Sequence, residues 1–390
     1  MNNFQFFNPT RIVFGKNAVD QLAEQLGKHS GGKILFHYGS NSIKKSGLYD
    51  KIIKILKDAS IEYVELGGVQ PNPRLSLVYK GIEICKKENC SFILAAGGGS
   101  VIDSAKGIAA GVFASGDIWS YYLDFFKPIP QALPIGVILT IPAAGSESSP
   151  SSVVTNEDGG YKRDIWSEAI IPKFALMDPE ITFTLPPYQT ACGVADILAH
   201  LMERYFSNTE HVDLGDRLSE GTMRSLLVNG PIVMKEPENY AARAEVMWAG
   251  TIANTGLLGK GREEDWASHK IEHELSGIYD IAHGAGLAVI FPAWMKYVYK
   301  VNKNKFLQFA VRVFDVDMEF SDIDAIINCM IQKLECFFKS LGLPVRLSEM
   351  NIDSSRLHEM AQKCFAHSDK MGGFMKLNAG DVEKIYRLAL

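Results

Sequence analysis

Three histidines and a glutamate lie close together in the segment SHKIEHELSGIYDIAHG, residues 268–284. His269, Glu272 and His273 have the H-x-x-E-H spacing, in which two histidines of one helix bind zinc and the glutamate activates water for peptide hydrolysis. A third histidine, His283, follows in the same segment and has no part in that signature. This segment alone therefore leaves a metallopeptidase open as one interpretation.

A carboxylate and a further histidine occur in the segment GVADILAHLMERY, within a predicted helix at residues 188–206. Asp196 and His200 are four residues apart, so a helix places both side chains on one face, where they can share a metal ion. One carboxylate with two or three imidazoles suits Zn²⁺ or Fe²⁺, and neither the spacing nor the ligand types distinguish these metals. The candidate ligands by residue type alone are Asp196, His200, His269, His273 and His283.

A run of three glycines is the strongest local feature of the first half, in the segment AAGGGSVIDSAK at residues 95–106. A predicted apolar strand leads into the glycines, and a predicted helix follows with Ser100 and Asp103 near its start. Glycines let the backbone approach a ligand closely, and the positive end of a helix favours an anion such as phosphate. The run is not the G-x-G-x-x-G fingerprint, so a tight turn without a ligand stays an alternative. Its place at the carboxyl end of a predicted parallel strand favours the phosphate site.

A second polar loop follows another apolar run in VILTIPAAGSES, residues 137–148. It places Thr140, Gly145 and Ser146 after a predicted strand, as the glycine run does for its own strand. Two such loops in one sheet predict a crevice for an extended ligand such as a dinucleotide. Three lysines are further candidates for phosphate or ribose contacts, although a lone lysine is more often a surface group: Lys44, Lys45 and Lys162.

Alternating strands and helices are predicted for the first half of the chain, and mainly helices for the second. Continuous apolar strands separated by amphipathic segments predict a parallel sheet with helices on both faces. The predicted strands are 33–38, 62–66, 91–96 and 134–141, with helices at 42–59 and 74–88. The later helices are predicted at 188–206, 213–229, 238–258, 262–277, 284–300, 321–341 and 379–389. We therefore predict an α/β domain at residues 1–185 and an all-α domain at residues 186–390.

Composition excludes several classes of protein. The 390 residues favour two domains, and 47% apolar with 22% charged residues is typical of a soluble globular protein. A net charge of −5 without a basic block argues against nucleic acid as a partner. The chain has neither a signal-peptide pattern nor an apolar run of about 18 residues, which argues against a membrane span. Its six cysteines include no C-x-x-C pair and fit a reducing cytoplasm.

The hydrolase interpretation explains only part of these features. It leaves the glycine loops, the Asp196–His200 pair and His283 without a role. A nucleotide-binding α/β domain joined to a helical metal domain explains all of them, because hydride transfer to a metal-polarised carbonyl needs both parts. In that interpretation Glu272 is a structural helix residue and the peptidase spacing is a coincidence.

Ordered motifs along nearly the whole chain resemble one family. They are NPTRIVFGK, YGSNSIKKSG, GGVQPNPR, GGGSVIDSAK, LTIPAAGSES, YKRDIW, DPEITFTLPPYQTACGVADILAH, KEPENYAAR and DWASHKIEHELSGIYDIAHGAGLAVIFP. The chain resembles the iron-dependent (group III) alcohol dehydrogenases, most closely their butanol dehydrogenase and NADPH-dependent aldehyde reductase branch. The family's fold is an N-terminal Rossmann-like α/β dinucleotide-binding domain followed by an all-α metal-binding domain.

The resemblance also implies roles for single residues. The family's metal ligands correspond to Asp196, His200, His269 and His283. His273 corresponds to a histidine beside the nicotinamide, and we expect it to be catalytic by relaying a proton. Cofactor contacts correspond to Asn72, Gly97, Gly98, Gly99, Ser100, Asp103, Thr140 and Lys162. Ala144 departs from the threonine of many members, which puts one hydroxyl contact of that loop in doubt.

The choice of cofactor depends on the segment LFHYGSNSIKKSG. NAD-preferring members of the family carry an aspartate after this strand, which holds the ribose hydroxyls and repels a 2′-phosphate. Here Gly39 and Ser40 occupy that region, and short donors and lysines follow, so phosphate oxygens gain charge-assisted contacts. We therefore predict that Gly39, Ser40 and Ser42 contact the cofactor, that NADP(H) is preferred over NAD(H), and that reduction is favoured.

The expected activity is the interconversion of short-chain aldehydes and primary alcohols, such as butanal and butanol, with one divalent metal, Fe²⁺ or Zn²⁺. A homodimer is expected through the N-terminal strand near residues 5–14, because QFFNPTRIVFG is an apolar, β-prone edge segment. Two alternatives stay open: the metallopeptidase, and a non-catalytic metal-binding or nucleotide-binding protein of the same fold.

Overall fold

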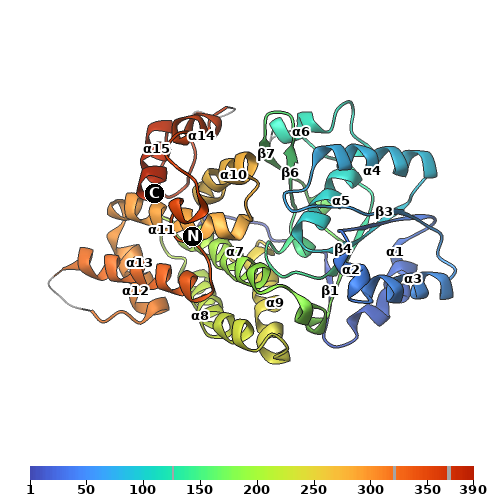
Figure 1. Cartoon of the computed structure of the whole chain (residues 1–390), viewed down its shortest axis with the longest axis horizontal. Helices are drawn as coiled ribbons and strands as arrows, with labels where there is room; N and C mark the ends of the chain where they lie inside the picture. Colours follow the sequence, from blue (N-terminus) through green and yellow to red (C-terminus); the bar gives the residue numbers. More distant parts are fainter. Residues whose placement is uncertain (125–126, 319–321, 367–369) are drawn as a thin grey trace. The chain divides into compact units, whose positions relative to one another are not determined.

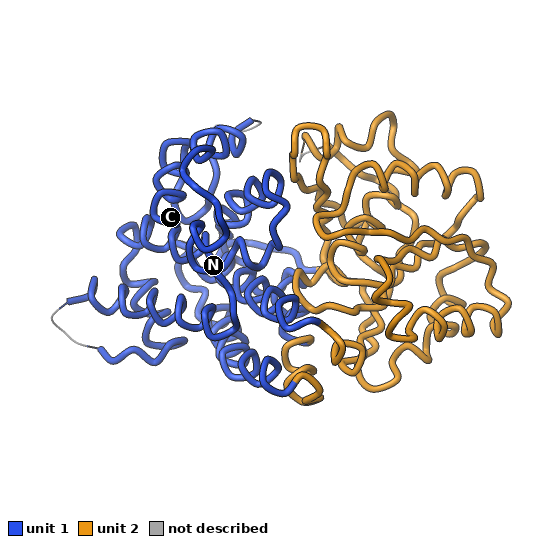
Figure 2. Tube along the Cα trace, viewed as in Figure 1, with its two compact units in different colours: residues 1–6, 186–236, 248–390 blue, residues 7–185, 237–247 orange. Residues whose placement is uncertain are grey.

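The chain forms two compact units, shown in different colours in Figure 2. The computed structural model describes residues 1–124, 127–318, 322–366 and 370–390. Unit 2 comprises Phe7–Leu185 and Pro237–Met247, and unit 1 comprises Met1–Phe6, Pro186–Glu236 and Trp248–Leu390. The main change between the units lies between Leu185 and Pro186. Of the two short segments, Met1–Phe6 belongs to unit 1 with the later residues, and Pro237–Met247 belongs to unit 2 with the earlier ones.

A six-stranded parallel sheet is the centre of unit 2 (Figure 1). Its spatial order is β1 (Arg11–Phe14), β8 (Phe174–Met177), β5 (Ile135–Leu139), β4 (Phe92–Gly97), β2 (Ile34–Tyr38) and β3 (Tyr63–Leu66). Every pair of neighbours in this sheet is parallel. This confirms the predicted α/β class, although β1 and β8 were not predicted as strands of this sheet.

Helices cover both faces of the sheet, and successive strand residues enter different cores. Ile93 and Ala95 of β4 pack in the core formed with α4 (Leu75–Glu88) and α5 (Gly99–Gly111). Phe92 and Leu94 of the same strand pack in the core formed with α1 (Leu22–His29) and α3 (Leu48–Asp58). Because side chains of a strand alternate between faces, a strand between two helical layers is apolar throughout.

Three local details of unit 2 differ from the predicted elements. The predicted helix 42–59 is two helices, α2 (Ser42–Lys45) and α3, because Gly47 adopts a left-handed φ of 77° between them. An antiparallel hairpin of β6 (Ser151–Asn156) and β7 (Tyr161–Trp166) was not predicted, and it carries Lys162. A short helix, α6 (Trp119–Leu123), was also not predicted.

Unit 1 is helical in its described residues, as predicted (Figure 1). Its helices are α7 (Pro187–Tyr205), α8 (Asp213–Lys235), α9 (Tyr240–Asn254, which begins in unit 2), α10 (Ala267–Tyr279), α11 (His283–Val298), α12 (Lys303–Phe314), α13 (Ile323–Ser340), α14 (Leu357–Lys363) and α15 (Ala379–Leu388). Residue 321, the predicted start of one helix, lies outside the described residues. The confirmed class is an α/β domain followed by a helical domain.

Two helix boundaries in unit 1 show how tertiary contacts override local signals. Helix α8 continues through Gly230 and Pro231, where a stop was predicted, and Gly230 packs closely against Val194 of α7. Helix α10 begins at Ala267 rather than near residue 262, because Trp266 has a left-handed φ of 63°. The backbone of the preceding residue is held by α7, since the Asp265 N–H donates to the Glu203 carbonyl at 3.0 Å.

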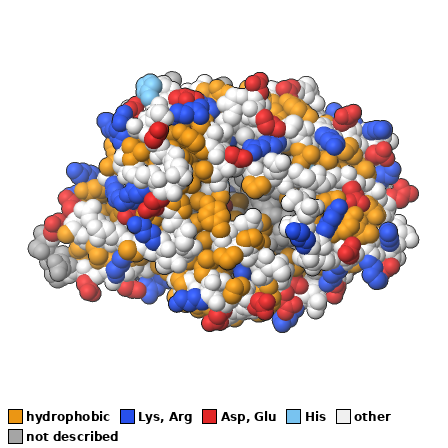
Figure 3. Space-filling model, in the orientation of Figure 1, with side chains coloured by type: hydrophobic (Ala, Val, Ile, Leu, Met, Phe, Trp, Pro, Cys, Tyr) orange, Lys and Arg blue, Asp and Glu red, His pale blue; other side chains and the backbone are white. Residues whose placement is uncertain are grey.

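Surface charge agrees with the composition. Basic and acidic side chains are interspersed over the face drawn in Figure 3, with no continuous basic area on that face. Among the helices of the described residues, none is both long and apolar enough to cross a membrane.

Candidate functional site

Asp196 and His200 lie one turn apart on α7 in unit 1, as their spacing predicted. His200 Nδ1 is 2.8 Å from the main-chain oxygen of Asp196 and 3.1 Å from its Oδ1 atom. Both side chains are buried. The ring is therefore held through Nδ1, and its Nε2 atom stays available as a ligand.

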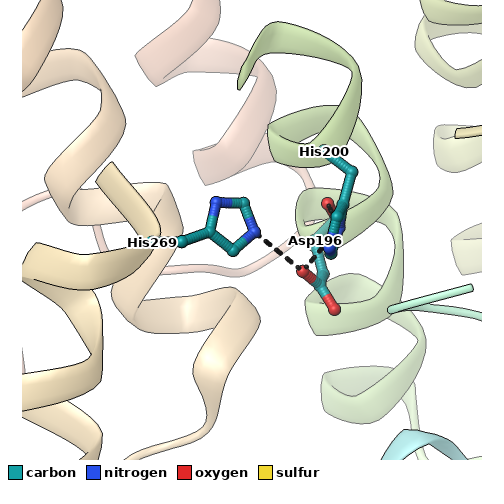
Figure 4. Close-up of side chains that lie close together, drawn as sticks. All are labelled: Asp196, His200 and His269. Atoms are coloured by element: carbon teal, nitrogen blue, oxygen red, sulfur yellow. Dashed lines mark hydrogen bonds and ion pairs between the residues drawn. The ribbon is translucent and has the colours of Figure 1, made fainter. Parts of the chain in front are cut away.

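Two histidines from other helices approach the same carboxylate. His269 Nε2, from α10, is 3.8 Å from Asp196 Oδ1, and His283 Nε2, from the first residue of α11, is 3.9 Å from it. Figure 4 shows Asp196 between His200 on its own helix and His269 on α10. The three predicted histidine ligands thus surround one carboxylate oxygen of the fourth, Asp196, within unit 1.

Two atoms at the centre of this cluster have unmet hydrogen-bonding capacity. Asp196 Oδ1 and His269 Nε2 are buried, and among the described residues neither has a hydrogen-bond partner. Burying polar atoms without partners is costly, so such atoms call for an explanation in a folded protein. A divalent cation between one carboxylate and three imidazoles would satisfy both, and this donor set fits Fe²⁺ or Zn²⁺.

Each of the three imidazoles is held at Nδ1 by an oxygen atom. His269 Nδ1 is 2.7 Å from Glu203 Oε1, and His283 Nδ1 contacts the Glu272 carboxylate. The oxygen for His200 is the Asp196 carbonyl. A hydrogen bond from Nδ1 to an oxygen fixes the tautomer, so Nε2 is the ring atom with which each of the three imidazoles could bind a metal.

Two glutamates contact the site in ways that the sequence did not predict: it predicted no role there for Glu203 and only a structural one for Glu272. Glu203 is one helical turn beyond His200 in AHLMERY, which was the available signal. Glu272 is the glutamate of the H-x-x-E-H spacing, but its carboxylate accepts from His283 Nδ1 and from the Ser276 hydroxyl. These contacts use the carboxylate to hold His283 and Ser276, which argues against its activating a water for hydrolysis.

The electrostatics of the cluster favour a charged carboxylate. Burial acts to raise the pKa of Asp196, but the neighbouring His200, His269 and His283 hold it well below its usual range. Burial lowers the pKa of His200. Burial acts to lower the pKa of His269, but the neighbouring carboxylates of Asp196 and Glu203 outweigh it and raise the pKa to about 9.

The predicted catalytic residue His273 lies next to the cluster without belonging to its centre. It is one turn beyond His269 on α10 and is buried. Its ring centroid is 5.5 Å from that of His283. His273 also groups with Glu272 and His283 as residues whose ligand atoms lie within 4.8 Å of one another.

Glycines in the segment HGAG explain how α11 comes close enough to present His283. A Cβ atom on Gly284 would lie 2.0 Å from the Cys192 carbonyl oxygen of α7, which is backbone and has little freedom to move. A Cβ atom on Gly286 would lie 2.5 Å from Glu272 Oε1. The two glycines therefore leave room for α7 and for the carboxylate that holds His283.

In unit 2, the predicted glycine loop lies at the carboxyl end of β4. Gly97 ends the strand, Gly98 is the N-cap of α5, and Gly99 begins that helix, followed by Ser100. Thr140, directly after the neighbouring strand β5, donates its N–H to the Gly97 carbonyl at 3.1 Å. The two predicted loops are thus adjacent, at the edge where parallel α/β sheets bind their ligands.

Asp103 is in α5, shortly after the glycine loop, and both of its carboxylate oxygens accept hydrogen bonds within unit 2. Its Oδ1 accepts from the Ser146 hydroxyl at 2.6 Å, and its Oδ2 accepts from the Val153 N–H at 3.1 Å. Lys106, one turn later, donates to Ser146 Oγ at 2.9 Å and to the Ser149 carbonyl at 2.8 Å. One carboxylate oxygen of Asp103 thus holds the second loop and the other holds β6, which favours a supporting role over direct contact with a cofactor.

The other predicted cofactor residues lie on neighbouring parts of the same unit. Buried Lys162, on β7, donates to Asn72 Oδ1 at 3.0 Å. Gly39 and Ser40 directly follow β2, and Ser42 begins α2. Because β2, β4 and β5 are neighbours in the sheet, their predicted loops occupy one edge.

Comparisons with known proteins agree with this arrangement. Residues 9–179 match the model of the iron-containing alcohol dehydrogenases, and residues 190–390 match the C-terminal model of the Fe-containing alcohol dehydrogenase family. The chain is 42% identical to a probable NADH-dependent butanol dehydrogenase of Bacillus subtilis, over all of both chains. It is 38% identical to an NADPH-dependent aldehyde reductase of Escherichia coli over 94% of both chains. The crystal structure of an NADH-dependent butanol dehydrogenase A from Thermotoga maritima is similar at a TM-score of 0.96, with 40% identity, covering 100% of this chain and 99% of that one.

Proposed function

Because the chain belongs to the iron-containing alcohol dehydrogenase family, we propose that it interconverts short-chain aldehydes and primary alcohols such as butanal and butanol. Its activity is that of an NAD(P)H-linked alcohol dehydrogenase or aldehyde reductase, a class to which its named relatives belong. The observation that carries the proposed site is the pair of buried atoms, Asp196 Oδ1 and His269 Nε2, which lack hydrogen-bond partners among the described residues. We assign Asp196, His200, His269 and His283 to the metal.

In the proposed mechanism, the chain's residues position the reactants and handle one proton. When bound, a divalent metal supplies a Lewis acid for the aldehyde oxygen, and the reduced nicotinamide supplies the hydride. Backbone amides of the loop Gly97–Ser100 bind the pyrophosphate at the start of α5. His273 delivers a proton to the alkoxide oxygen, because its buried imidazole is adjacent to the ligand His283.

Replacing His273 by Asn tests this proton transfer separately from metal binding. We expect the turnover number to fall about a hundredfold, since general acid catalysis typically contributes 10² to 10⁴ in rate. Metal content, measured by elemental analysis, should stay at the wild-type level. Unchanged turnover over the accessible pH range would assign the proton transfer to another group.

The metal is proposed to be Fe²⁺ or Zn²⁺. Imidazole and carboxylate suit both ions. Elemental analysis of protein purified without oxygen identifies the one bound. Chelation should abolish aldehyde reduction, measured by the absorbance of the reduced nicotinamide, and the identified ion should restore it. Full activity in chelator would contradict a metal-dependent reaction.

We also propose that this chain prefers NADPH, although several similar proteins are named as NADH-dependent. Gly39 directly follows β2 and places no carboxylate where it would repel a 2′-phosphate. Lys44 lies over the ring of Tyr49, 4.9 Å from its centroid, and over that of Tyr38, at 5.7 Å. These contacts hold a cation close to the end of β2.

Substituting Gly39 by Asp tests the preference. The site accepts a side chain, because a Cβ atom there would meet only ordinary contacts at 3.8 Å with Val101 and the Val69 carbonyl. We expect the ratio of kcat/KM for NADPH to that for NADH to fall at least tenfold. Gly31→Asp is the matched control, since it adds the same charge before β2, where a Cβ atom meets nothing within 4 Å. Equal or better catalytic efficiency with NADH in the wild type would contradict the preference.

A homodimer through the N-terminal segment is proposed from its exposed apolar side chains and its edge strand. Phe4, Phe6 and Phe7 are 53%, 45% and 63% exposed. They precede β1, which is at an edge of the sheet and so offers backbone groups for pairing with a second copy. Light scattering should give the mass of two chains at micromolar concentration, and a monomeric mass would contradict the proposal.

A further inference from the structure

Two of the proposed metal ligands are held by buried carboxylates rather than by main-chain oxygens. We propose that Glu203 and Glu272 are positioning residues that fix His269 and His283 as Nε2 ligands and strengthen metal binding. This inference rests on the proposed metal centre. The expectation is that the same four ligands would bind a metal ion more weakly if the two carboxylates were absent.

Glu203 connects the two helices that supply three of the ligands. It lies on α7 and is completely buried. Its Oε1 accepts from His269 Nδ1 at 2.7 Å and from the His269 N–H at 3.0 Å. Its Oε2 accepts from the Trp266 N–H at 2.7 Å. One carboxylate therefore holds both the imidazole and the first turn of α10, which fixes His269 relative to Asp196 and His200.

Glu272 acts on His283 in a simpler way. It is completely buried on α10, and its two oxygens accept from His283 Nδ1 and from the Ser276 hydroxyl. The space for this carboxylate exists because Gly286 has no side chain. Ser276 Oγ is also 3.3 Å from the Ile281 carbonyl, so the hydroxyl has a second acceptor to which it can donate.

The third imidazole provides an internal contrast. His200 Nδ1 is held by a main-chain carbonyl of its own helix, which carries no full charge. A carboxylate partner makes an imidazole more basic at Nε2 than a carbonyl does, and such partners typically change metal affinity ten- to a hundredfold. We therefore expect the charge of Glu203 and Glu272, and not only their hydrogen bonds, to contribute to affinity.

The two carboxylates differ in a way that allows a clean test. In Glu272→Gln, the amide oxygen can still accept from His283, and the amide nitrogen can donate to Ser276 Oγ. This variant removes the charge and keeps the shape and both hydrogen bonds. In Glu203→Gln, an amide oxygen that accepts from His269 leaves the amide nitrogen facing the Trp266 N–H. Glu203→Gln therefore also weakens the start of α10.

Glu274 is the matched control. It is a buried carboxylate of the same helix, but its Oε2 pairs with Lys363 Nζ at 3.6 Å. Glu274→Gln thus removes a buried negative charge from the same helix, and that charge is paired with a lysine. It therefore controls for the effect of losing buried charge in general.

The experiment measures Zn²⁺ dissociation constants by competition with a chromophoric chelator, on metal-free protein, together with melting temperatures of the metal-free forms. We expect Glu272→Gln to weaken Zn²⁺ binding at least tenfold with an unchanged melting temperature. Glu203→Gln should weaken binding at least as much and lower the melting temperature, while Glu274→Gln should bind Zn²⁺ like the wild type. Visible spectra of the Co²⁺-substituted proteins should shift in Glu203→Gln and Glu272→Gln only.

Each result supports or overturns this inference separately from the proposed metal centre. Wild-type affinity in Glu272→Gln would overturn the role of its charge. Equal weakening in Glu274→Gln would also overturn it, because the effect would then follow from buried charge in general. If His269→Ala binds Zn²⁺ as tightly as the wild type, the metal centre itself is wrong and the inference fails with it.

Discussion

Buried charged groups occur in both units, but their surroundings differ. In unit 2, Lys106 is completely buried and donates to Ser146, to both oxygens of Ser149 and to the Ser151 carbonyl. Burial lowers its pKa to about 8. In unit 1, Asp196 Oδ1 and His269 Nε2 are also buried but have no hydrogen-bond partner among the described residues.

This difference separates groups that shape a site from groups that bind at it. A buried charge whose hydrogen bonds are made within the protein holds neighbouring segments in place. A buried polar atom that lacks such bonds, in a cluster of ligand-type residues, indicates a ligand instead. We therefore expect substitutions in the two units to change different properties. Substitutions at the cluster in unit 1 should lower metal affinity, whereas substitutions around Lys106 in unit 2 should lower both stability and cofactor affinity.

The largest effect is expected from His269→Ala and from His283→Ala. Each removes one of four ligands and leaves the Asp196 carboxylate buried with fewer partners, so aldehyde reduction should fall at least about a thousandfold, of the order of 4 kcal/mol in transition-state stabilisation. Elemental analysis should show loss of metal. NADPH binding, followed by its fluorescence, should be retained. Full metal content and turnover in both variants would show that the ligand assignment is wrong.

Gly284→Ala should produce the next largest effect. The added Cβ atom would lie 2.0 Å from the Cys192 carbonyl oxygen, so α11 and with it His283 must shift. Displacement of a catalytic group by about 1 Å can cost a hundredfold in rate, and we expect a loss of that order with weaker metal binding. Gly221→Ala on α8 is the control, because a Cβ atom there meets nothing within 4 Å. Wild-type kinetics in Gly284→Ala would contradict the packing argument.

Lys106→Met should act on unit 2 alone. It leaves the buried carbonyls of Ser149 and Ser151 without the donor that Lys106 supplies, and an unsatisfied buried polar group typically costs about 1–3 kcal/mol. We expect a lower melting temperature and a KM for NADPH raised about tenfold, since Lys106 and Asp103 both hold the loop that contains Ser146. Zn²⁺ affinity should equal that of the wild type. A parallel loss of Zn²⁺ affinity would break the comparison.

The smallest effect concerns His37, a fully buried histidine of β2. Its ring nitrogens contact the Leu66 carbonyl at 2.8 Å and Ser104 Oγ at 2.9 Å, and burial lowers its pKa from 6.5 to about 4. His37 binds a proton more readily in the unfolded chain than in the folded one. Its contribution to the free energy of unfolding is therefore fully present above pH 6.5 and is lost as the pH falls toward 4. We expect its contribution to fall by about 2 kcal/mol between pH 7 and pH 5, on the basis of 1.36 kcal/mol per unit of pKa.

Urea unfolding at several pH values measures this change. His37→Asn should be less stable at neutral pH but should show a shallower decline toward pH 5 than the wild type. An equal slope in the two proteins would assign the acid sensitivity to other groups.

The sequence predicted the sheet well where strands are continuously apolar. Residues 34–38 and 92–97 were recognised because both faces of these strands are buried. The hairpin of β6 and β7 was missed because its residues are mixed in polarity, and α12 was missed although Asn302 caps it. Its buried Phe306, Phe309, Ala310 and Val313 have helical spacing and were an unused signal.

The sequence predicted most residues of the proposed site, but it did not predict the contacts that support them. Asp196 and His200 follow from helical spacing, whereas their proximity to His269 and His283 depends on how three helices pack. Glu203 lies one helical turn beyond His200, but this spacing alone does not place its carboxylate against His269. The spacing of Glu272 likewise does not place it against His283, because a glutamate on a helix is usually exposed to solvent. The close approach at Gly284 is likewise a tertiary property, since the contacting carbonyl belongs to Cys192 on another helix.

The central proposal is that different units bind the two reactive groups: unit 1 binds the metal and unit 2 binds the nicotinamide cofactor. It is tested most directly with metal-free wild-type protein, by measuring butanal reduction and NADPH binding before and after adding one equivalent of Fe²⁺ or Zn²⁺. The account predicts that the metal-free protein binds NADPH without reducing butanal, and that one equivalent of the correct ion restores turnover. Full reduction of butanal by the metal-free protein would contradict it.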